Sequence, residues 1–350
     1  KKIFFSDRKV ILSAIKNKNI NLSNNLKINV IKETAKIKRL SPLITIKKAR
    51  INSQEVTKND IFFAIKGKKN DGNKFVTQSF KRKASLAVVN KIQNKFNNNR
   101  QIKVKNTLKF LTNVSKIFRK SIDTNIIAIT GSCGKTTLKE LLGNTLNKIS
   151  KVSISPKSYN NKFGVPLSLF NINQKDEFGI LEVGMDKKGE IDYLSKIIEP
   201  DVGVITNINY AHAKNFKNIK QIALAKSEII DNIRLYGFIV LNADDSFFKL
   251  HYNIAKKKNI KVISFGIKNL KADIKLINIK PFRKKFRINI SLNNKRKYFS
   301  LSNDFQNNIY NILSALAVIS IYKNIFKLDK NIFYDFKIPG GRGDHSVIKF

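Results

Sequence analysis

The chain has 350 residues, enough to bury a sizeable core and to form two or three domains. Hydrophobic residues make up 42% of it, which excludes wholesale disorder. Its 68 Lys and Arg residues far exceed its 24 Asp and Glu residues, but they are spread along the whole chain and Arg is scarce. We therefore expect affinity for anionic substrates such as nucleotides, and no specific nucleic-acid partner.

The N-terminal third predicts a small α/β domain. Residues 1–40 are rich in Lys and Asn and have no assigned role, whereas 41–105 alternate apolar runs with turn signals. The predicted elements of this domain are strands at 61–65 and 87–89 and a helix at 75–83. The glycine-containing loop 66–72 is either a ligand-binding loop or an ordinary turn.

The remainder predicts one larger domain, 106–335, that opens with an amphipathic helix at 106–125. Strands are expected at 126–130, 151–154, 178–183, 202–205, 237–241 and 261–265, with helices at 136–148, 164–171, 189–197, 218–233 and 245–256. This alternation favours a mostly parallel sheet with helices on both faces, as in P-loop ATPases. Antiparallel edge strands within 272–301 and a helix at 305–323 follow. The fold class is therefore α/β, and residues 336–350 are expected to be a hinge that leads into a further, missing domain.

Cysteine content and hydropathy indicate the compartment. The one cysteine, Cys133, allows no disulfide framework and fits a reducing environment. The N-terminus shows no signal-peptide pattern, and the longest apolar helical run, 309–322, contains Asn311 and is too short to span a bilayer. We expect a cytoplasmic monomer that is not inserted into a membrane.

The strand at 126–130 leads into a glycine loop and then a helix. This order predicts a phosphate cradle, in which backbone N–H groups and the helix N-terminus face an anion. Lys135 would reach the β- and γ-phosphates and the Thr136 hydroxyl would hold Mg²⁺. The alternative is an ordinary glycine turn, since Ile129 stands where the strict P-loop has its first glycine. The candidate nucleotide-binding residues are Gly131, Ser132, Cys133, Gly134, Lys135, Thr136 and Thr137.

Polar residues follow three of the predicted strands where each strand ends. Glu182 ends one strand, Asn207 and His212 follow the next, and Asn242 and Asp244 follow a third. The carboxyl ends of parallel strands meet at one edge of the sheet, where ligands bind. From pattern alone, Glu182 is either a metal ligand or a solvated carboxylate, and His212 is either a ligand or a surface residue.

Five stretches of the central region share residues and order with one known family. They are 130–140, Asn160-Asn161 with Gly164-Val165-Pro166, 181–185 with 189–191, the block from Thr206-Asn207-Ile208 through His212 to Ala225-Lys226-Ser227-Glu228-Ile229, and 241–245. Upstream, 59–67 with Asp71-Gly72 resembles the same family's UDP-substrate domain. Over residues 45–345 the chain resembles the Mur ligases, which assemble the peptidoglycan stem peptide. The Asn-Asn-x-x-Gly-Val-Pro element favours the member that adds D-alanyl-D-alanine.

The resemblance implies an ATP- and Mg²⁺-dependent amide ligase. ATP would phosphorylate the terminal carboxylate of UDP-MurNAc-tripeptide, and the amine of D-alanyl-D-alanine would displace the phosphate. Glu182 and His212 resemble ligands of a second Mg²⁺, and Lys226 matches a lysine that the family carbamylates. With Lys135, these residues would carry catalysis. Further matches are Asn311 and Arg342 for the nucleotide, and Ser53, Asn160 and Asn161 for the substrate.

The sequence departs from the family in several places, which leaves two alternatives open. Asn52-Ser53-Gln54 replaces the usual Asp-Ser-Arg, Lys162 replaces a Glu, and Phe305-Gln306-Asn307-Asn308 replaces Gly-x-His-Asn. The chain also stops just after Arg342, where the family has a third domain, so we expect a fragment that turns over poorly. One alternative is a related ligase for another acid and amine, such as a folate- or amino-acid-polymer-type enzyme. The other is a non-catalytic nucleotide-binding paralogue.

Overall fold

The computed structural model divides the chain into two compact units. Among the described residues, the N-terminal unit comprises 26–123 and 162–174, and the central unit comprises 124–161 and those from 175 onward. The residues that the structure describes are 26–37, 40, 44–67, 70–96, 98–210, 215–282, 285–302, 305 and 308–338.

The N-terminal unit is built on a short sheet. In its described residues four strands lie in the order β1-β2-β3-β4, and each neighbouring pair is parallel. Phe62 of β2 and Val89 of β3 pack against Val76 and Phe80 of a helix, which confirms the α/β module predicted there. Its main elements are α2 (Leu26–Ala35), β1 (Ala49–Arg50), β2 (Ile61–Phe63), α3 (Val76–Lys81), β3 (Leu86–Val89), β4 (Gln101–Lys103) and α4 (Thr107–Ser121).

Helix α6 (Gly164–Phe170) also belongs to this unit, although the sequence around it enters and leaves the central sheet. Ser115 of α4 donates a hydrogen bond to the Pro166 carbonyl at 2.7 Å. The Asn171 side chain pairs with both backbone groups of Ala49, accepting from its N–H at 2.7 Å and donating to its carbonyl at 3.0 Å. Because these long-range contacts are invisible to local pattern, the sequence placed both α4 and α6 in the central domain.

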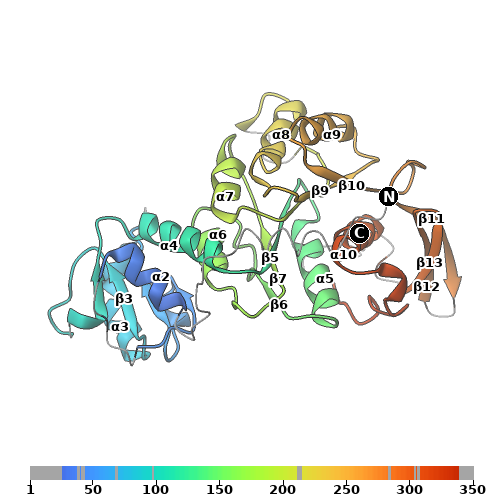
Figure 1. Ribbon diagram of the computed structural model, residues 1–350. Helices are drawn as coiled ribbons and strands as arrows, with labels where there is room; N and C mark the ends of the chain where they lie inside the picture. Colours follow the sequence, from blue (N-terminus) through green and yellow to red (C-terminus); the bar gives the residue numbers. More distant parts are fainter. Residues whose placement is uncertain are drawn as a thin grey trace, which may run out of the picture. The chain divides into compact units, whose positions relative to one another are not determined.

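The central unit contains one large, mostly parallel sheet (Figure 1). Nine strands of the described chain lie in the order β13-β12-β11-β10-β9-β8-β5-β7-β6, and only the pairs among β11, β12 and β13 are antiparallel. This arrangement confirms the predicted parallel sheet with an antiparallel edge. The strands are β5 (Asn125–Thr130), β6 (Val152–Ile154), β7 (Phe178–Glu182), β8 (Val202–Ile205), β9 (Phe238–Asn242), β10 (Lys261–Gly266), β11 (Ile274–Phe282), β12 (Lys285–Leu292) and β13 (Lys295–Ser302).

Helices cover both faces of this sheet, because its central strands are apolar on both sides. Ile127 and Ile129 of β5 join the core formed with α5 and α10, and Ile126 and Ala128, which alternate with them, are also fully buried. The predicted helix at 218–233 is shorter in the structure: α8 ends at Ser227, and a 3-10 turn follows at Ile230–Asn232. The helices are α5 (Lys135–Asn147), α7 (Glu190–Ile198), α8 (Ile219–Ser227), α9 (Phe248–Lys257) and α10 (Ile309–Tyr322).

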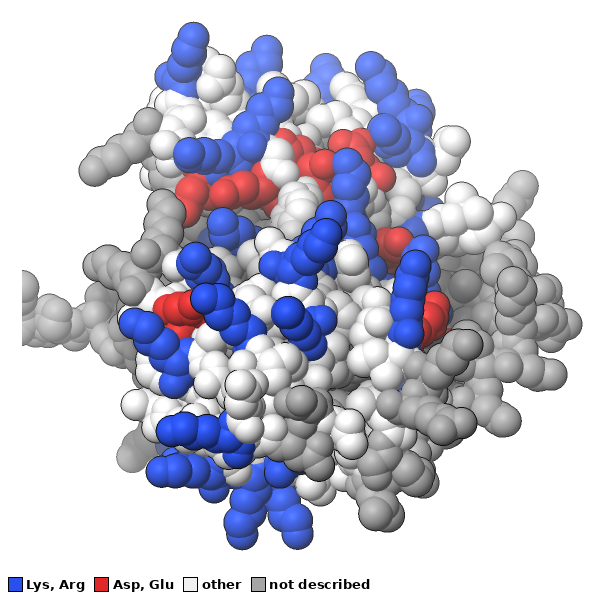
Figure 2. Space-filling view, turned by 90° about the vertical axis from the view of Figure 1, so that its left-hand side faces the viewer, with Lys and Arg blue, Asp and Glu red and all other residues white. Residues whose placement is uncertain are grey.

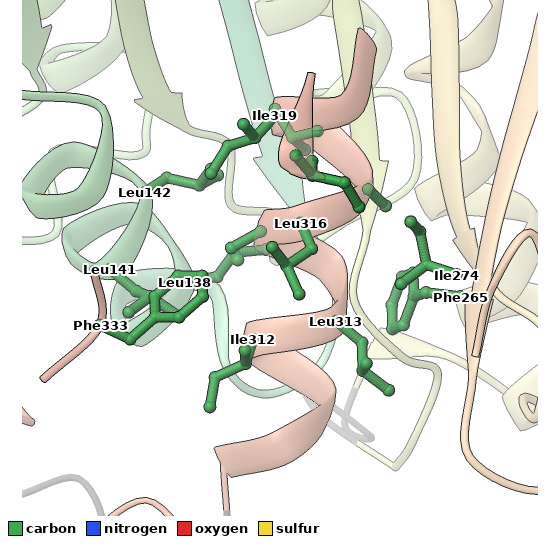
Figure 3. Packing of buried hydrophobic residues seen from close by; sticks show 14 of the residues in the cluster. Leu138, Leu141, Leu142, Phe265, Ile274, Ile312, Leu313, Leu316, Ile319 and Phe333 are labelled. Atoms are coloured by element: carbon green, nitrogen blue, oxygen red, sulfur yellow. The ribbon is translucent and has the colours of Figure 1, made fainter. Parts of the chain in front are cut away.

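Helix α10 is apolar nearly all round, as expected of a helix buried inside a domain. Figure 3 shows Ile312 and Ile319 on the side toward α5, and Leu313 on the side toward Phe265 and Ile274. Leu316 lies between them and is completely buried. This packing fixes α10 against α5, the helix that begins at the phosphate loop.

Charged side chains are scattered over the surface. On the face drawn in Figure 2, Lys and Arg side chains occur over most of the area, with Asp and Glu side chains grouped among them. This scatter matches the even spread of lysines along the sequence. Within the described residues, no helix has both the length and the apolar character needed to cross a bilayer.

The buried position of α10 predicts a large loss of stability when one of its core side chains is shortened. Leu316→Ala should lower the free energy of unfolding by about 2–5 kcal/mol, because it removes buried methyl groups and leaves a cavity. Leu224→Ala is the matched control, since Leu224 on α8 is 40% exposed, and should change stability by less than about 0.5 kcal/mol. Urea unfolding measures both, and equal losses would contradict the packing described.

Candidate functional site

The phosphate loop joins β5 to α5 through backbone conformations that favour glycine. Gly131 has φ of +143° and Gly134 has φ of +82°, both in the region that L side chains rarely adopt. Space is also limiting, because a Cβ on Gly131 would lie 1.9 Å from the Thr206 hydroxyl oxygen. Gly134 is the N-cap residue of α5, so no cap side chain stands before the helix N-terminus. The loop therefore leaves room for an anion at this point.

The loop after β8 holds the phosphate loop in place. The Ser132 N–H donates to the Asn207 carbonyl at 2.9 Å, and the Cys133 N–H donates to the Asn207 side-chain oxygen at 3.0 Å. The Thr206 hydroxyl donates to the Cys133 carbonyl at 2.6 Å. The Asn209 N–H donates to the Ser132 hydroxyl at 2.8 Å. These bonds fix the loop before any ligand binds, so its ordering does not have to be supplied by binding.

Two lysine amines converge on one backbone carbonyl. Lys135 Nζ lies 2.9 Å from the Gly131 oxygen, and Lys226 Nζ lies 3.0 Å from the same oxygen. Burial, followed by the like charge of Lys135, lowers the pKa of Lys226 to about 7, although the Cys133 thiol acts in the opposite direction. A concentration of positive charge of this kind, next to a helix N-terminus, suits a polyphosphate.

A buried carboxylate lies beside the first turn of α5. The Thr136 hydroxyl donates to Glu182 Oε2 at 2.6 Å, and the Asn160 side chain donates to Glu182 Oε1 at 2.8 Å. Glu182 is the last residue of β7 and is only 1% exposed, so it is not a solvated strand-end carboxylate. A hydroxyl and a carboxylate are the hard oxygen ligands that Mg²⁺ takes, usually with waters and substrate phosphates completing its shell. The donor set fits this ion.

The N-terminus of α10 forms another wall of the site. A Cβ on Gly134 would lie 2.9 Å from the Asn311 side-chain oxygen, so Asn311 stands directly against the phosphate loop. The Asn311 amide also donates to the Asn308 side chain at 3.0 Å. Asn311 is therefore next to the loop, as expected for a nucleotide-binding residue.

Asp244 ties α10 to the loop after β10. Its carboxylate accepts three successive backbone N–H groups, those of residues 267–269, at 2.6–3.0 Å and the Tyr310 hydroxyl at 3.0 Å. Burial acts to raise the pKa of Asp244, but these hydrogen bonds outweigh it and hold that pKa below its usual value. Burial and the neighbouring carboxylate raise the pKa of Tyr310 to about 12, so Tyr310 stays a hydrogen-bond donor.

The structure brings most of the predicted central residues together and leaves some elsewhere. The loop residues, Glu182, Asn160, Lys226 and Asn311 meet through the contacts described above. Thr137 is buried within α5, and Asn161 is exposed next to Asn160. Ser53 lies in the N-terminal unit, where its hydroxyl donates to the Gln78 side chain at 2.6 Å. His212 and Arg342 lie outside the described residues.

Sequence reasoning missed several residues of the site. Thr206 and Tyr310 were not predicted as site residues. Each stands next to a residue that was singled out, Asn207 or Asn311, and this position in the sequence was the available signal. Lys139 is fully buried, four residues after Lys135, and so lies on the same side of α5. In a chain this rich in lysine, only its place among the apolar residues of a predicted helix could have singled it out.

The crowding at Gly134 predicts a loss of nucleotide binding. Gly134→Ala should weaken binding of ADP roughly tenfold or more, equivalent to about 1.4 kcal/mol, because the methyl group meets Asn311 and strains the loop. Gly189→Ala is the matched control: Gly189 has φ of +87° but no atom within 4 Å of the added methyl group. Isothermal titration calorimetry should show reduced affinity only for the first variant. Equal affinities would contradict the described loop geometry.

Comparison with known proteins agrees with this geometry. Residues 129–319, more than half of the chain, match the model of the Mur ligase middle domain. The chain is similar to a UDP-N-acetylmuramoyl-tripeptide--D-alanyl-D-alanine ligase of Buchnera aphidicola subsp. Baizongia pistaciae, 32% identical over 81% of this chain and 60% of the relative.

Solved structures give the same result. The chain is similar to a crystal structure of MurF from Acinetobacter baumannii, with a TM-score of 0.72, 27% identity, and coverage of 84% of this chain and 64% of the other. It is also similar to a MurF ligase from Thermotoga maritima in complex with ADP, with a TM-score of 0.71, 25% identity, and coverage of 85% and 67%. The chain thus spans about 60% of the Buchnera relative's length. Because residues 129–319 match the Mur ligase middle domain, the chain belongs to the Mur ligase family.

Proposed function

We propose that this chain is an ATP-dependent acid–amino-acid ligase of peptidoglycan synthesis, which joins D-alanyl-D-alanine to UDP-MurNAc-tripeptide. One observation carries the proposal: two lysine amines and a helix N-terminus face a glycine loop beside the Thr136–Glu182–Asn160 cluster. That arrangement suits transfer of a phosphoryl group from ATP. The names of the similar proteins supply the acid and the amine.

The side chains of the central unit divide the work of phosphoryl transfer. Lys135 and the N-terminus of α5 hold the β- and γ-phosphates, and Asn311 contacts the nucleotide from α10. Thr136 would hold the Mg²⁺ that accompanies the phosphates, and Glu182, which accepts the Thr136 hydroxyl, would hold a second Mg²⁺ together with His212. When bound, Mg²⁺ supplies positive charge that offsets the charge developing on the phosphate oxygens. Asn160 keeps the Glu182 carboxylate oriented toward Thr136.

The reaction then proceeds in two balanced steps. The substrate carboxylate attacks the γ-phosphorus of ATP, so that an acyl phosphate forms and ADP leaves. The amine of D-alanyl-D-alanine attacks the acyl carbon, loses a proton, and expels phosphate. The contribution of the protein is positioning and charge neutralisation, because the positive groups at the loop offset negative charge in both steps.

The N-terminal unit would bind the UDP part of the acid substrate. Its candidate loop is held by a hydrogen bond: the Asn52 side chain caps the turn at Ser53–Glu55, where Ser53 is only 5% exposed. Buried Asp60 supports this region by accepting hydrogen bonds from the Lys48 N–H and the Arg50 side chain at 3.1 Å each. Neutral Asn52 and Gln54 stand where the family carries charges, so recognition here depends on hydrogen bonding.

Lys226 has the properties that carbamylation requires. The neutral amine is the form that attacks CO₂, giving a carbamate and releasing a proton, and burial with Lys135 nearby favours that neutral form. The product carries a negative charge that pairs with Lys135 in place of the repulsion present before reaction. A carbamate also supplies oxygen atoms of the kind that position Mg²⁺. The monomeric state and the cytoplasmic location remain predictions from sequence.

The proposed ligase predicts a strict substrate requirement. Phosphate release from ATP should occur only when UDP-MurNAc-tripeptide and D-alanyl-D-alanine are both present, and mass spectrometry should detect the joined product. Glu182→Gln should lower this rate roughly 100-fold, because it removes the charge beside Thr136. Glu177→Gln should leave it unchanged, because Glu177 is exposed just before the opposite end of β7.

Two results would reject that assignment. Phosphate release with other acids and amines, but not with this pair, would favour a related ligase. Nucleotide binding without turnover on any pair, in the natural full-length protein, would favour a non-catalytic paralogue.

The carbamate predicts a pH-dependent spectroscopic signal. With ¹³C-labelled bicarbonate, a carbamate resonance should appear and grow between about pH 6 and about pH 8, because the pKa of Lys226 is about 7 and its neutral form increases with pH. Lys226→Ala should abolish the resonance, while Lys220→Ala, an exposed lysine on the same helix, should retain it. A signal that persists in Lys226→Ala would refute the assignment.

A further inference from the structure

Lys139 is a lysine without solvent contact in the second turn of α5. Its side chain is 0% exposed, and Leu138 and Leu142 of the same helix are core residues. A buried ammonium group loses its hydration, so lysine is almost never found in such a place unless it is paired. The partners of Lys139 therefore define what the residue does.

Its ammonium group holds the loop that follows β6. Lys139 Nζ donates to the Ser155 carbonyl at 2.7 Å and to the Lys157 carbonyl at 2.5 Å, and it pairs with Glu140 at 3.1 Å. Lys157 has φ of +47°, an unfavourable conformation for a residue with a side chain. The bond to its carbonyl helps to keep that residue in this conformation, and so to keep the turn in place.

Asn160 lies three residues after Lys157 in the same loop, and it contacts Glu182, the candidate metal ligand. The Asn160 side chain donates to Glu182 Oε1 at 2.8 Å, and its carbonyl accepts the Gly184 N–H at 2.8 Å. The Ser155 hydroxyl accepts the Glu182 N–H at 3.3 Å. Both ends of the loop are thus bonded to the end of β7, and Lys139 connects the loop to α5.

The contacts close a ring around the Glu182 carboxylate. From α5, Thr136 reaches Glu182 Oε2 directly, and Lys139 reaches Oε1 through the loop and Asn160. Both carboxylate oxygens are therefore positioned from the same helix that carries Lys135. A change in this ring would alter the direction of the carboxylate without touching the phosphate loop itself.

Lys139 also has a structural role, because an apolar side chain of similar length would leave the Ser155 and Lys157 carbonyls without this donor. Its charge is nevertheless poorly placed for α5, because it lies near the positive N-terminal end of a helix with no acidic residue in its first turn.

We propose that Lys139 is a positioning residue that fixes Glu182 for Mg²⁺ through the loop 155–160. The inference rests on the proposed function only for the identity of the ion, and it needs no turnover. Without the Lys139 contacts, a higher Mg²⁺ concentration should be needed to enhance nucleotide affinity. The affinity for nucleotide without metal should stay the same.

Lys139→Met tests this with ADP titrated calorimetrically, once with a range of Mg²⁺ concentrations and once with EDTA. The Mg²⁺ concentration for half-maximal enhancement of ADP affinity should rise about 10–100-fold, as for loss of an outer-shell partner. The affinity in EDTA should change less than about twofold. Hydrogen exchange at the Gly184 amide should accelerate, because that amide is bonded to the Asn160 carbonyl.

Lys297→Met is the matched control. Lys297 also clamps two backbone carbonyls, those of Phe326 and Leu328, but it lies on β13, away from the phosphate loop. This variant should leave the Mg²⁺ dependence unchanged. If Lys139→Met does not fold, Lys139→Gln replaces it, because a shorter neutral amide cannot bridge both carbonyls.

A double-mutant cycle with Asn160→Ala separates positioning from general damage. If Lys139 acts through Asn160, adding Lys139→Met to Asn160→Ala should raise the required Mg²⁺ concentration less than about twofold further. If the double variant raises the required Mg²⁺ concentration by the product of the two single effects, the proposal is overturned. Equal losses of ADP affinity with Mg²⁺ and in EDTA would also overturn it. This inference does not depend on the ligase assay, because each variant is compared with the Mg²⁺-dependent ADP binding of the wild-type chain.

Discussion

The site depends on positive charge gathered at one backbone carbonyl. Lys135 and Lys226 both donate to the Gly131 oxygen, and α5 begins four residues further on, at Lys135. Burial, followed by the like charge of Lys135, lowers the pKa of Lys226 to about 7, so near neutral pH the lasting positive charge comes from Lys135 and the helix N-terminus. That charge would stabilise an anion at the loop. Gly131 and Gly134 keep side chains out of this turn.

Parallel strands explain how distant residues reach this point. Glu182, Asn207 and Asp244 come from three strands or the loops just after them, and the shared strand direction brings those ends to one edge of the sheet. The two adjacent acidic residues after β9 then hold different loops. Asp244 holds the loop after β10 and Tyr310, whereas Asp245 accepts the Ile208 N–H at 2.7 Å in the loop after β8. One short turn thus holds two walls of the candidate site.

The sequence predicted the sheet well because its strands are buried on both faces and read as short apolar runs separated by helical patterns. It also singled out the glycine loop and Glu182, since glycine spacing and a carboxylate after an apolar strand are local signals, and their roles stay predictions. It could not predict that α6 packs with the N-terminal unit, because the Ser115–Pro166 and Asn171–Ala49 contacts join residues 51 and 122 positions apart. The Asp244–Tyr310 contact escaped for the same reason. Roles of His212 and Arg342 still rest on motif resemblance.

Lysine identity carries almost no information in this chain, so environment has to distinguish one lysine from another. Lys226 and Lys139 are both buried in the central unit, 2% and 0% exposed. Among the described residues, Lys226 donates to one carbonyl, and its burial, followed by the charge of Lys135, lowers its pKa to about 7. Lys139 contacts two carbonyls and a carboxylate, which connect it to the loop after β6. We therefore propose reactivity for Lys226 and positioning for Lys139, because their partners among the described residues differ although the side chain is the same.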